Sequence, residues 1–481
     1  MACAVHCPRP MIRRSALNLA ALSFFSVVGA VAACTSETII KESPAPAPTA
    51  TDTPDADAPE TEAPDAAPPK PPAKVTFPEV LSRGGPTIKT PKVVPIVFPG
   101  DALAASIGTF TTKIGASQYW KDLGAQYKVG PMTAGATITL TEAAPTTITS
   151  DAIETWLIGK LSGATPAFGA PDESTLYSIY YPASTTITMD GAGAQGQSCQ
   201  GYGGYHSEVT VGSKTVGYAV LPRCADIDDL TVSASHEYFE WATDPFPMTK
   251  PAYSRLDDAH WAWQVVMIGE LGDLCTYLDR DNIRPAEINF LVQREWSNTA
   301  SLAGKYPCAP AKTSPYLQVI AEAEDPVVVP DYGDQTKSLT TKAISVKAGG
   351  SRTVDALVYS DQAAKTTVPM RAISHADFGG GGGPSGFTFT VSQNQAKVGE
   401  KVQITIDAPT KAGYDIMVMT AYTGPDSAHY WPILVVTDDF ASARAPHVPE
   451  PEAFARLRGQ LTPRARRPST KLGIPQARRS L

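Results

Sequence analysis

The pattern of apolar residues changes near Pro310, and this change limits the folds that the chain can adopt. Before Pro310, helical spacing of apolar residues alternates with β-branched runs such as PKVVPIVFPGD at 91–101. After Pro310 come short alternating strands separated by Gly and Pro, such as KVQITIDAP at 401–409. The sequence therefore predicts an α+β domain over residues 75–310, followed by a separable, all-β, immunoglobulin-like sandwich over residues 311–439.

Within the first domain, four segments carry clear patterns of secondary structure. Apolar spacing predicts helices over 109–127 and 151–161. The segments STLYSIYYPA at 174–183 and KTVGYAVLPRC at 214–224 have the composition of strands. Helices and strands thus mix along the chain, which is the basis for the α+β assignment.

The first 34 residues have the pattern of a bacterial lipoprotein signal peptide. Arg13 and Arg14 precede an apolar run from Ala16 to Ala30, and small residues then lead to Cys34. The run is shorter than the about 20 residues of a membrane-spanning helix. Its end resembles a lipobox, which implies a lipid on Cys34 and an anchor in the bacterial cell membrane, with the outer membrane favoured and the folded part facing the periplasm or the exterior. An ordinary cleaved signal peptide or a short anchor helix is the alternative, and either still implies export.

Two further segments are poor in apolar pattern. Residues 35–74 consist mainly of Pro, Ala, Thr, Asp and Glu, which bury too little apolar surface to offset the entropy of ordering, so a disordered tether is expected. Residues 440–481 form a basic tail, also expected to be disordered. Such a tail can contact anionic lipid, cell-wall polymer or nucleic acid. A solvated arm is the favoured interpretation, because the formal net charge of the chain is −8, and no nucleic-acid partner is expected.

The seven cysteines fall into two groups. Cys3 and Cys7 belong to the signal, and Cys34 carries the lipid. Four remain in the folded part: Cys199, Cys224, Cys275 and Cys308. An even number in an exported protein indicates two disulfides, and of the three possible connectivities the local pairs 199–224 and 275–308 are preferred. A cysteine-rich zinc site is the competing idea, but no Cys-x-x-Cys spacing occurs.

The segment SASHEYFEWATDPFP at 233–247 contains His-Glu-x-x-Glu on a helix expected from about Leu230 to Thr243. Residues four apart share one helix face, so His236 and Glu240 can reach one cation. Zinc accepts imidazole nitrogen and carboxylate oxygen, and Glu237 can act as the general base toward a water molecule. The alternative is a buried helix that carries three polar residues without a metal.

A third metal ligand must come from outside this helix. Glu270, in GELGDLC at 269–275, is the first choice because flanking glycines allow close backbone approach. Asp273, Asp244 and His260 are reserves. His206, in YGGYHSE at 202–208, is either a residue that polarises the substrate or a surface histidine.

These motifs occur in an order that resembles the phosphate-induced, exordium-like family and its bacterial secreted relatives. The resemblance covers about residues 84–308 and includes SCQGYGGYHS, SHEYFEWATDPFP, GELGDLC and FLVQREWSN. It implies a zincin-like core in which His206, His236, Glu237, Glu240, Glu270 and Asp273 form one site.

The expected function is that of an exported, lipid-anchored zinc-dependent hydrolase that acts on peptide or protein substrates. The rival hypothesis is an adhesion or signalling protein of the envelope with a structural metal or none. No Gly-x-Ser-x-Gly elbow, phosphate-binding loop or dinucleotide fingerprint occurs. The sequence names no substrate and no oligomeric state.

Overall fold

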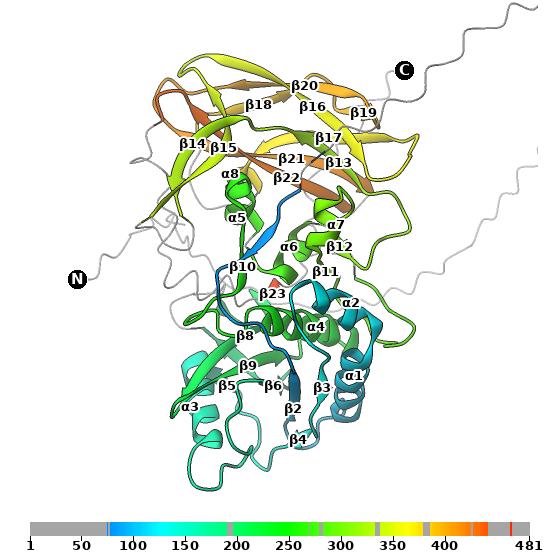
Figure 1. Ribbon diagram of the computed structural model, residues 1–481, viewed down its shortest axis with the longest axis vertical. Coiled ribbons are helices and arrows are strands. Elements are labelled where there is room, and N and C mark those ends of the chain that lie inside the picture. The colour runs from blue at the N-terminus through cyan, green and yellow to red at the C-terminus, as the bar shows by residue number, and fades with distance from the viewer. Residues whose placement is uncertain are drawn as a thin grey trace, which may run out of the picture. The chain divides into compact units, whose positions relative to one another are not determined.

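In the computed structural model, a mixed seven-stranded sheet forms the centre of the first half of the chain (Figure 1). Its order is β23-β8-β9-β6-β2-β3, with β4 also paired to β2. β2, β6 and β9 run parallel, whereas β8 is antiparallel to β9. The strands are β2 (Lys92–Val97), β3 (Thr133–Ala134), β4 (Ile138–Thr139), β6 (Thr175–Tyr181), β8 (Tyr202–Val211), β9 (Lys214–Pro222) and β23 (Thr462–Pro463).

The structure describes residues 75, 77–189, 196–267, 269–278, 282–331, 337–378, 385–424, 427–440 and 462–463. The predicted signal peptide with Cys34, the predicted tether and nearly all of the predicted tail lie outside these residues. The described residues belong to one compact unit. Within them, no helix combines the length and the apolar character that a membrane span requires.

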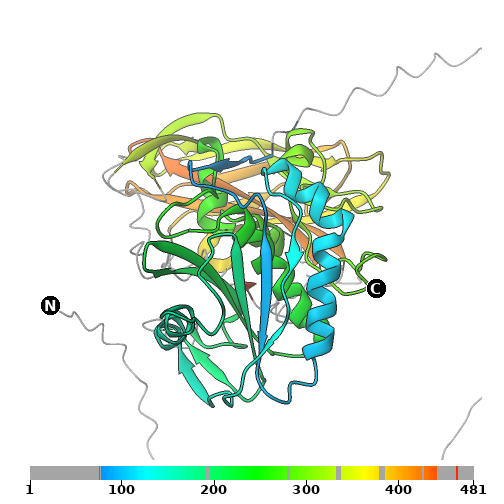
Figure 2. The same ribbon diagram turned by 60° about the horizontal axis from the view of Figure 1, so that its bottom comes forward.

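Helices cover both faces of this sheet. Alternate residues of β2 point to opposite faces: Val93 packs in one core with Phe110 and Phe239, whereas Ile96 packs in a second core with Leu157. The first face carries α1 (Ala104–Ala116), α2 (Gln118–Gln126) and α4 (Ile227–Thr243), and the second carries α3 (Ser150–Leu161). Figure 2 shows α1 and α3 on opposite sides of the strands.

The expectation of one helix over 109–127 is wrong, because the chain breaks at Ser117 between α1 and α2. Ser117 has extended backbone angles, and its side chain accepts a hydrogen bond from the backbone N–H of Trp120. A serine at this position caps the second helix and so favours the break over continuation.

Shorter elements surround the sheet. The pairs are β1 (Val80–Ser82) with β10 (Tyr253–Leu256), β5 (Thr147–Thr149) with β7 (Thr186–Thr188), and β11 (Glu295–Trp296) with β12 (Cys308–Ala309). The remaining helices of this half are η2 (Asp258–His260), α5 (Trp261–Met267), α6 (Leu271–Leu278) and α7 (Asn298–Leu302).

Both preferred disulfides are present, Cys199–Cys224 and Cys275–Cys308. The second joins α6 to β12. Disulfides persist in oxidising compartments, which places the folded part outside the cytoplasm, in the periplasm or the extracellular space.

The second half of the chain is built from two sheets. Together with the helices of the first half, they confirm the predicted α+β class. One sheet has the order β13-β16-β20-β18, and the other has the order β14-β15-β22-β21-β17-β19. Neighbouring strands are antiparallel except for β15 and β22. The strands are β13 (Leu317–Ala321), β14 (Asp325–Pro330), β15 (Ser338–Val346), β16 (Ser351–Ser360), β17 (Thr367–Ser374), β18 (Thr388–Val391), β19 (Gln395–Lys397), β20 (Lys401–Asp407), β21 (Tyr414–Gly424) and β22 (Ser427–Thr437), with one short helix, α8 (His375–Phe378). The immunoglobulin-like assignment stays a prediction.

A continuous apolar core joins the two halves. The ring of Phe77 lies 5.6 Å from Tyr316 and 5.2 Å from Trp431, and Trp263 lies 5.0 Å from Trp431. Tyr316 and Trp431 come from the second half, and all four side chains are buried. The boundary near Pro310 therefore separates two patterns of secondary structure whose side chains pack in one apolar core, which argues against a separable sandwich.

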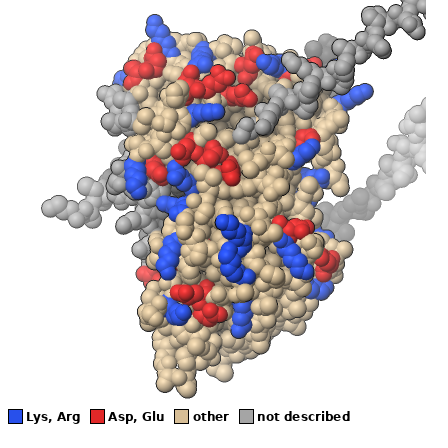
Figure 3. All heavy atoms as spheres, viewed as in Figure 1, with Lys and Arg blue, Asp and Glu red and all other residues tan. Residues whose placement is uncertain are grey.

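Charged side chains of both signs lie interspersed on the face shown in Figure 3. On that face, neither Lys and Arg nor Asp and Glu gather into one large patch of a single sign.

Candidate metal centre

The His-Glu-x-x-Glu motif lies on a helix that runs through the core. α4 starts at Ile227, three residues before the predicted start, because Asp226 accepts hydrogen bonds from the backbone N–H groups of Asp228 and Asp229 at 3.0 and 3.1 Å. Every residue of α4 from Ser233 to Thr243 is buried. The motif therefore faces protein on all sides.

Three glycines allow neighbouring elements to approach α4 closely. A Cβ atom at Gly217 of β9 would lie 2.1 Å from Nε1 of Trp241, and one at Gly204 of β8 would lie 3.1 Å from Oε1 of Glu237. A Cβ atom at Gly272 of α6 would lie 2.6 Å from Nδ1 of His236. Real Cβ atoms essentially never lie as close as those at Gly217 and Gly272 would, so β9 and α6 can lie this close to α4 only with glycine there, whereas a Cβ atom at Gly204 would need a small shift of its neighbours.

Potential ligand atoms gather between α4, β8 and α6. Among the described residues, two trios have donor atoms that all lie within 4.8 Å of one another. One trio is His206, Glu240 and Glu270, and the other is His236, Glu237 and Glu240. The predicted set of His236, Glu240 and Glu270 is thus divided between the trios, with Glu240 common to both.

Glu240 is held in place by the start of α6. Its Oε1 atom accepts hydrogen bonds from the backbone N–H groups of Gly272 and Asp273, at 3.1 and 3.0 Å. Its Oε2 atom lies 3.0 Å from Nε2 of His236 and 3.7 Å from Nδ1 of His206. One carboxylate oxygen is therefore fixed by the backbone, and the other faces both imidazoles.

Gln293 sets the orientation of His236, a role that no pattern in the sequence predicted. Oε1 of Gln293 lies 3.0 Å from Nδ1 of His236 and accepts a hydrogen bond from Thr276 Oγ1 at 2.9 Å. The Nε2 amide of Gln293 donates to the carbonyl oxygen of Gly272 at 2.6 Å. Because Oε1 can only accept, neutral His236 carries its proton on Nδ1 and presents the lone pair of Nε2 to Glu240. The only signal in the sequence was the position of Gln293 within FLVQREWSN.

The unsatisfied atoms at this site fit a bound cation. Nε2 of His236 and Oε2 of Glu240 form no hydrogen bond, although they lie only 3.0 Å apart. With the proton of His236 on Nδ1, both facing atoms are acceptors, and they repel each other unless a proton or a cation lies between them. The same lack of a hydrogen-bond partner affects Nε2 of His206, Oε2 of Glu270 and both carboxylate oxygens of Asp273. Buried polar atoms are rarely left unpaired, so the donor set suits a metal ion.

The pKa values of these groups show how the site behaves without metal. Burial, followed by the charge of Glu240, raises the pKa of Glu270 and of Asp273 well above their ordinary values. Burial alone would lower the pKa of His236, but Glu240 and Glu237 outweigh it, and the pKa is raised well above its ordinary value. Burial would raise the pKa of Glu240, but His236 outweighs it and lowers that pKa. The cluster therefore retains protons, which a divalent cation can replace.

Glu295 is a further buried carboxyl beside the cluster that the sequence did not point out. It is fully buried, burial raises its pKa well above the ordinary value, and Tyr119 donates a hydrogen bond to its Oε1 atom at 3.4 Å. It belongs to neither trio. Glu295 lies on β11, far from α4 in the sequence, so only the tertiary structure brings the two together.

Two of the reserve ligands have other partners. Oδ1 of Asp244 accepts a hydrogen bond from the backbone N–H of Ala252 at 2.6 Å. Nδ1 of His260 lies 2.8 Å from Oδ1 of Asp257. The third reserve ligand, Asp273, lies beside the motif: its Oδ1 atom is 3.8 Å from Nε2 of His236. The choice of metal ligands and the identity of the metal stay predictions.

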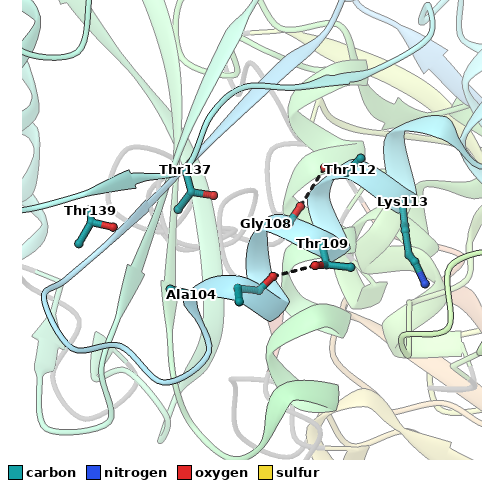
Figure 4. A pocket seen from close by; sticks show the side chains of 8 residues that line it. Ala104, Gly108, Thr109, Thr112, Lys113, Thr137 and Thr139 are labelled. Carbon is teal, nitrogen blue, oxygen red and sulfur yellow. Dashed lines mark hydrogen bonds between the residues drawn. The ribbon is translucent and has the colours of Figure 1, made fainter.

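A surface hollow of about 660 Å³ lies away from this cluster, along α1 and the segment that contains β3 and β4 (Figure 4). Its side chains are small, apart from Lys113. The hydroxyl groups of Thr109 and Thr112 donate to the carbonyl oxygens of Ala105 and Gly108 within α1, at 2.8 and 3.0 Å. The hollow thus lacks the converging polar groups of a ligand site.

Comparisons with known proteins do not identify a family. No family model and no curated protein matches the sequence. Similar solved structures include domains 4 and 5 of the S-layer protein SbsC, at 16% identity and a TM-score of 0.16, over 27% of this chain and 56% of that one. They also include a PapD-like domain of human CEP192, at 13% identity and a TM-score of 0.17, over 28% of this chain and 92% of that domain. A nucleoside hydrolase-related hypothetical protein from Saccharophagus degradans aligns over 73% of this chain and 99% of that one, at 9% identity and a TM-score of 0.22. The chain spans about half the length of the SbsC fragment. At these TM-scores the likenesses support no conclusion about fold or function.

Proposed function

We propose that the protein is a lipid-anchored, zinc-dependent hydrolase of the bacterial cell envelope, with a zincin-like core, that cleaves peptide bonds. The observation that carries the proposal is the 3.0 Å approach of Nε2 of His236 to Oε2 of Glu240 in the core, a pair of atoms that needs a proton or a cation between them. His236, Glu240 and Glu270 would hold the zinc, which when bound would polarise a carbonyl group and lower the pKa of water.

Glu237 is the general base in this proposal. Its Oε2 atom lies 3.2 Å from Nδ1 of His206, and it shares a trio with His236 and Glu240. A carboxylate at this position can take a proton from a water molecule beside the metal. His206 would hold the carboxylate of Glu237 in the orientation needed for that transfer.

The burial of the site favours the rival function. His206, His236 and Glu237 are all 0% exposed, and Glu240 is 1% exposed. A structural metal needs no opening, whereas a peptide substrate does. The rival is therefore an adhesion or signalling protein in which the metal stabilises the fold.

The test uses the full chain purified without chelator and compares three variants. Glu237→Gln should keep about one zinc per chain and lose about 10²–10⁴-fold in peptide hydrolysis, because only the base is removed. His236→Ala should lose both zinc and hydrolysis. Glu295→Gln removes an equally buried carboxyl that belongs to neither trio, and as the matched control it should keep both.

Unfolded proteins and peptide mixtures at neutral pH are suitable substrates, with and without chelator. Tightly held zinc without any cleavage by the wild type would reject the hydrolase and favour the structural metal. A wild type without metal would reject the hydrolase and leave the rival in its metal-free form.

A further inference from the structure

We infer that His206 is itself a metal ligand and supplies from β8 the second imidazole that a His-Glu-x-x-His helix would carry at position 240. This inference rests on the proposed metal centre and adds a ligand to it. It replaces the two alternatives expected from the sequence, a residue that polarises the substrate and a surface histidine. The surface position is wrong, because His206 is 0% exposed.

The alternation of β8 directs His206 toward α4. Successive side chains of a strand point to opposite faces. Tyr205 and Val209 pack in the core on the far side of the sheet, so Gly204, His206 and Glu208 face α4. In β9, Ala219 lies opposite His206 and belongs to the core on the α4 side. The strand therefore presents one imidazole to the helix beside a glycine that leaves room for Glu237.

The two imidazoles approach the same carboxylate oxygen. Oε2 of Glu240 lies 3.0 Å from Nε2 of His236 and 3.7 Å from Nδ1 of His206, the nitrogen that also contacts Glu237. Ligands of a tetrahedral zinc at its usual bond lengths are about 3.4 Å apart. The ligand atoms of His206, Glu240 and Glu270 all lie within 4.8 Å of one another, so they must move closer to one another to bind one zinc at that spacing.

The hydrogen bonds of His206 fit a metal ligand better than a histidine whose only role is to bind Glu237. One ring nitrogen, Nδ1, already contacts Glu237 at 3.2 Å, and the other, Nε2, is buried without a partner. Metal-binding histidines characteristically donate their second N–H to a carboxylate. His236 follows the same pattern with Gln293 at 3.0 Å. Each imidazole thus has one nitrogen held by protein and one without a hydrogen-bond partner, which is Nε2 in both rings.

A neutral imidazole adds no charge, so the enlarged set keeps the charge balance of the proposed centre. Two neutral imidazoles and the carboxylates of Glu240 and Glu270 neutralise a divalent cation. Four protein ligands close a tetrahedral site, as in structural zinc centres, so the hydrolase needs the fifth position that zinc can add in a transition state. Glu237 stays outside the set as the base.

The experiment counts the imidazoles bound to zinc in the full chain. X-ray absorption of the zinc-loaded wild type should show two imidazoles per zinc, and His206→Asn should show one. Competition with a chelator should show that His206→Asn binds zinc at least about 100-fold more weakly, because the loss of a ligand exceeds the 10–100-fold effect of an outer-shell change. His429→Asn, which changes a buried histidine of the sandwich, is the matched control and should leave both values unchanged.

The outcomes separate the inference from the proposed function. A wild type with zinc but a single imidazole, together with wild-type affinity in His206→Asn, would overturn the inference and leave the metal centre standing. A wild type without zinc would overturn both. If His206→Asn fails to fold, the imidazole count of the wild type still decides.

Discussion

Gly272 offers the sharpest test of the packing around the motif. A Cβ atom at this position would lie 2.6 Å from Nδ1 of His236 and 2.9 Å from Oε1 of Glu240. To reach ordinary contact, α6 must move away from α4 by about 0.8 Å, which is large for a close-packed interior. Gly272→Ala therefore disturbs the two side chains that the metal centre depends on.

The expected loss of stability follows from three terms. Overpacking in a core costs about 1–3 kcal/mol. Weakening the hydrogen bonds from Gly272 and Asp273 to Oε1 of Glu240 costs about 1–3 kcal/mol more, because a buried charged acceptor loses its donors. The better helix propensity of Ala returns about 1 kcal/mol. We expect a net loss of about 3 kcal/mol and zinc binding weakened about 10–100-fold.

Gly159→Ala is the matched control, because Gly159 also lies inside a helix and a Cβ atom there would meet nothing within 4 Å. It should raise stability by about 0.5–1 kcal/mol and leave zinc binding unchanged. The assay is guanidinium unfolding followed by tryptophan fluorescence, with chelator competition for zinc. If Gly272→Ala matches Gly159→Ala in both measurements, the close packing of α6 on the motif is not needed and the reasoning fails.

Three further predictions concern the anchor, the shared core and pH. Cys34→Ser should move the protein from the membrane fraction to the soluble fraction, and an unchanged pellet would count against lipidation at this residue. A fragment that ends at Pro310 should aggregate, because it exposes Phe77 and Trp263, which pack against Trp431 in the full chain. A soluble fragment that unfolds cooperatively would show that the two halves are independent. Without metal, the free energy of unfolding should fall as pH rises above about 4.5, where Glu270 and Asp273 ionise in the unfolded chain but stay protonated in the folded one. It should fall further above about 6.5, because His206 and His236 also have raised pKa values in the folded state. Saturating zinc should remove this fall because it displaces those protons, and equal pH profiles in denaturant titrations with zinc and with chelator would contradict the account.

Much of the local structure was predictable from sequence. β-branched runs, apolar spacing and proline positions predicted β2, β6, β9 and α3 within a few residues, because these signals act over a few neighbouring positions. Cysteine number and spacing gave both disulfide pairs. The helical break at Ser117 was missed, because capping by a single side chain competes with the apolar pattern.

The sequence by itself determined that His236, Glu237 and Glu240 share one helix, since helical spacing requires nothing beyond the chain between them. Only the tertiary structure decided that His206 and Glu270 join them and that Gln293 orients His236, because these residues come from a strand and loops up to 87 residues apart in the chain. It also decided that the two halves share a core around Trp431, for which no local pattern exists. Contacts between distant segments depend on how sheets and helices pack, and glycines such as Gly204, Gly217 and Gly272 reveal their role only when the neighbouring atom is known.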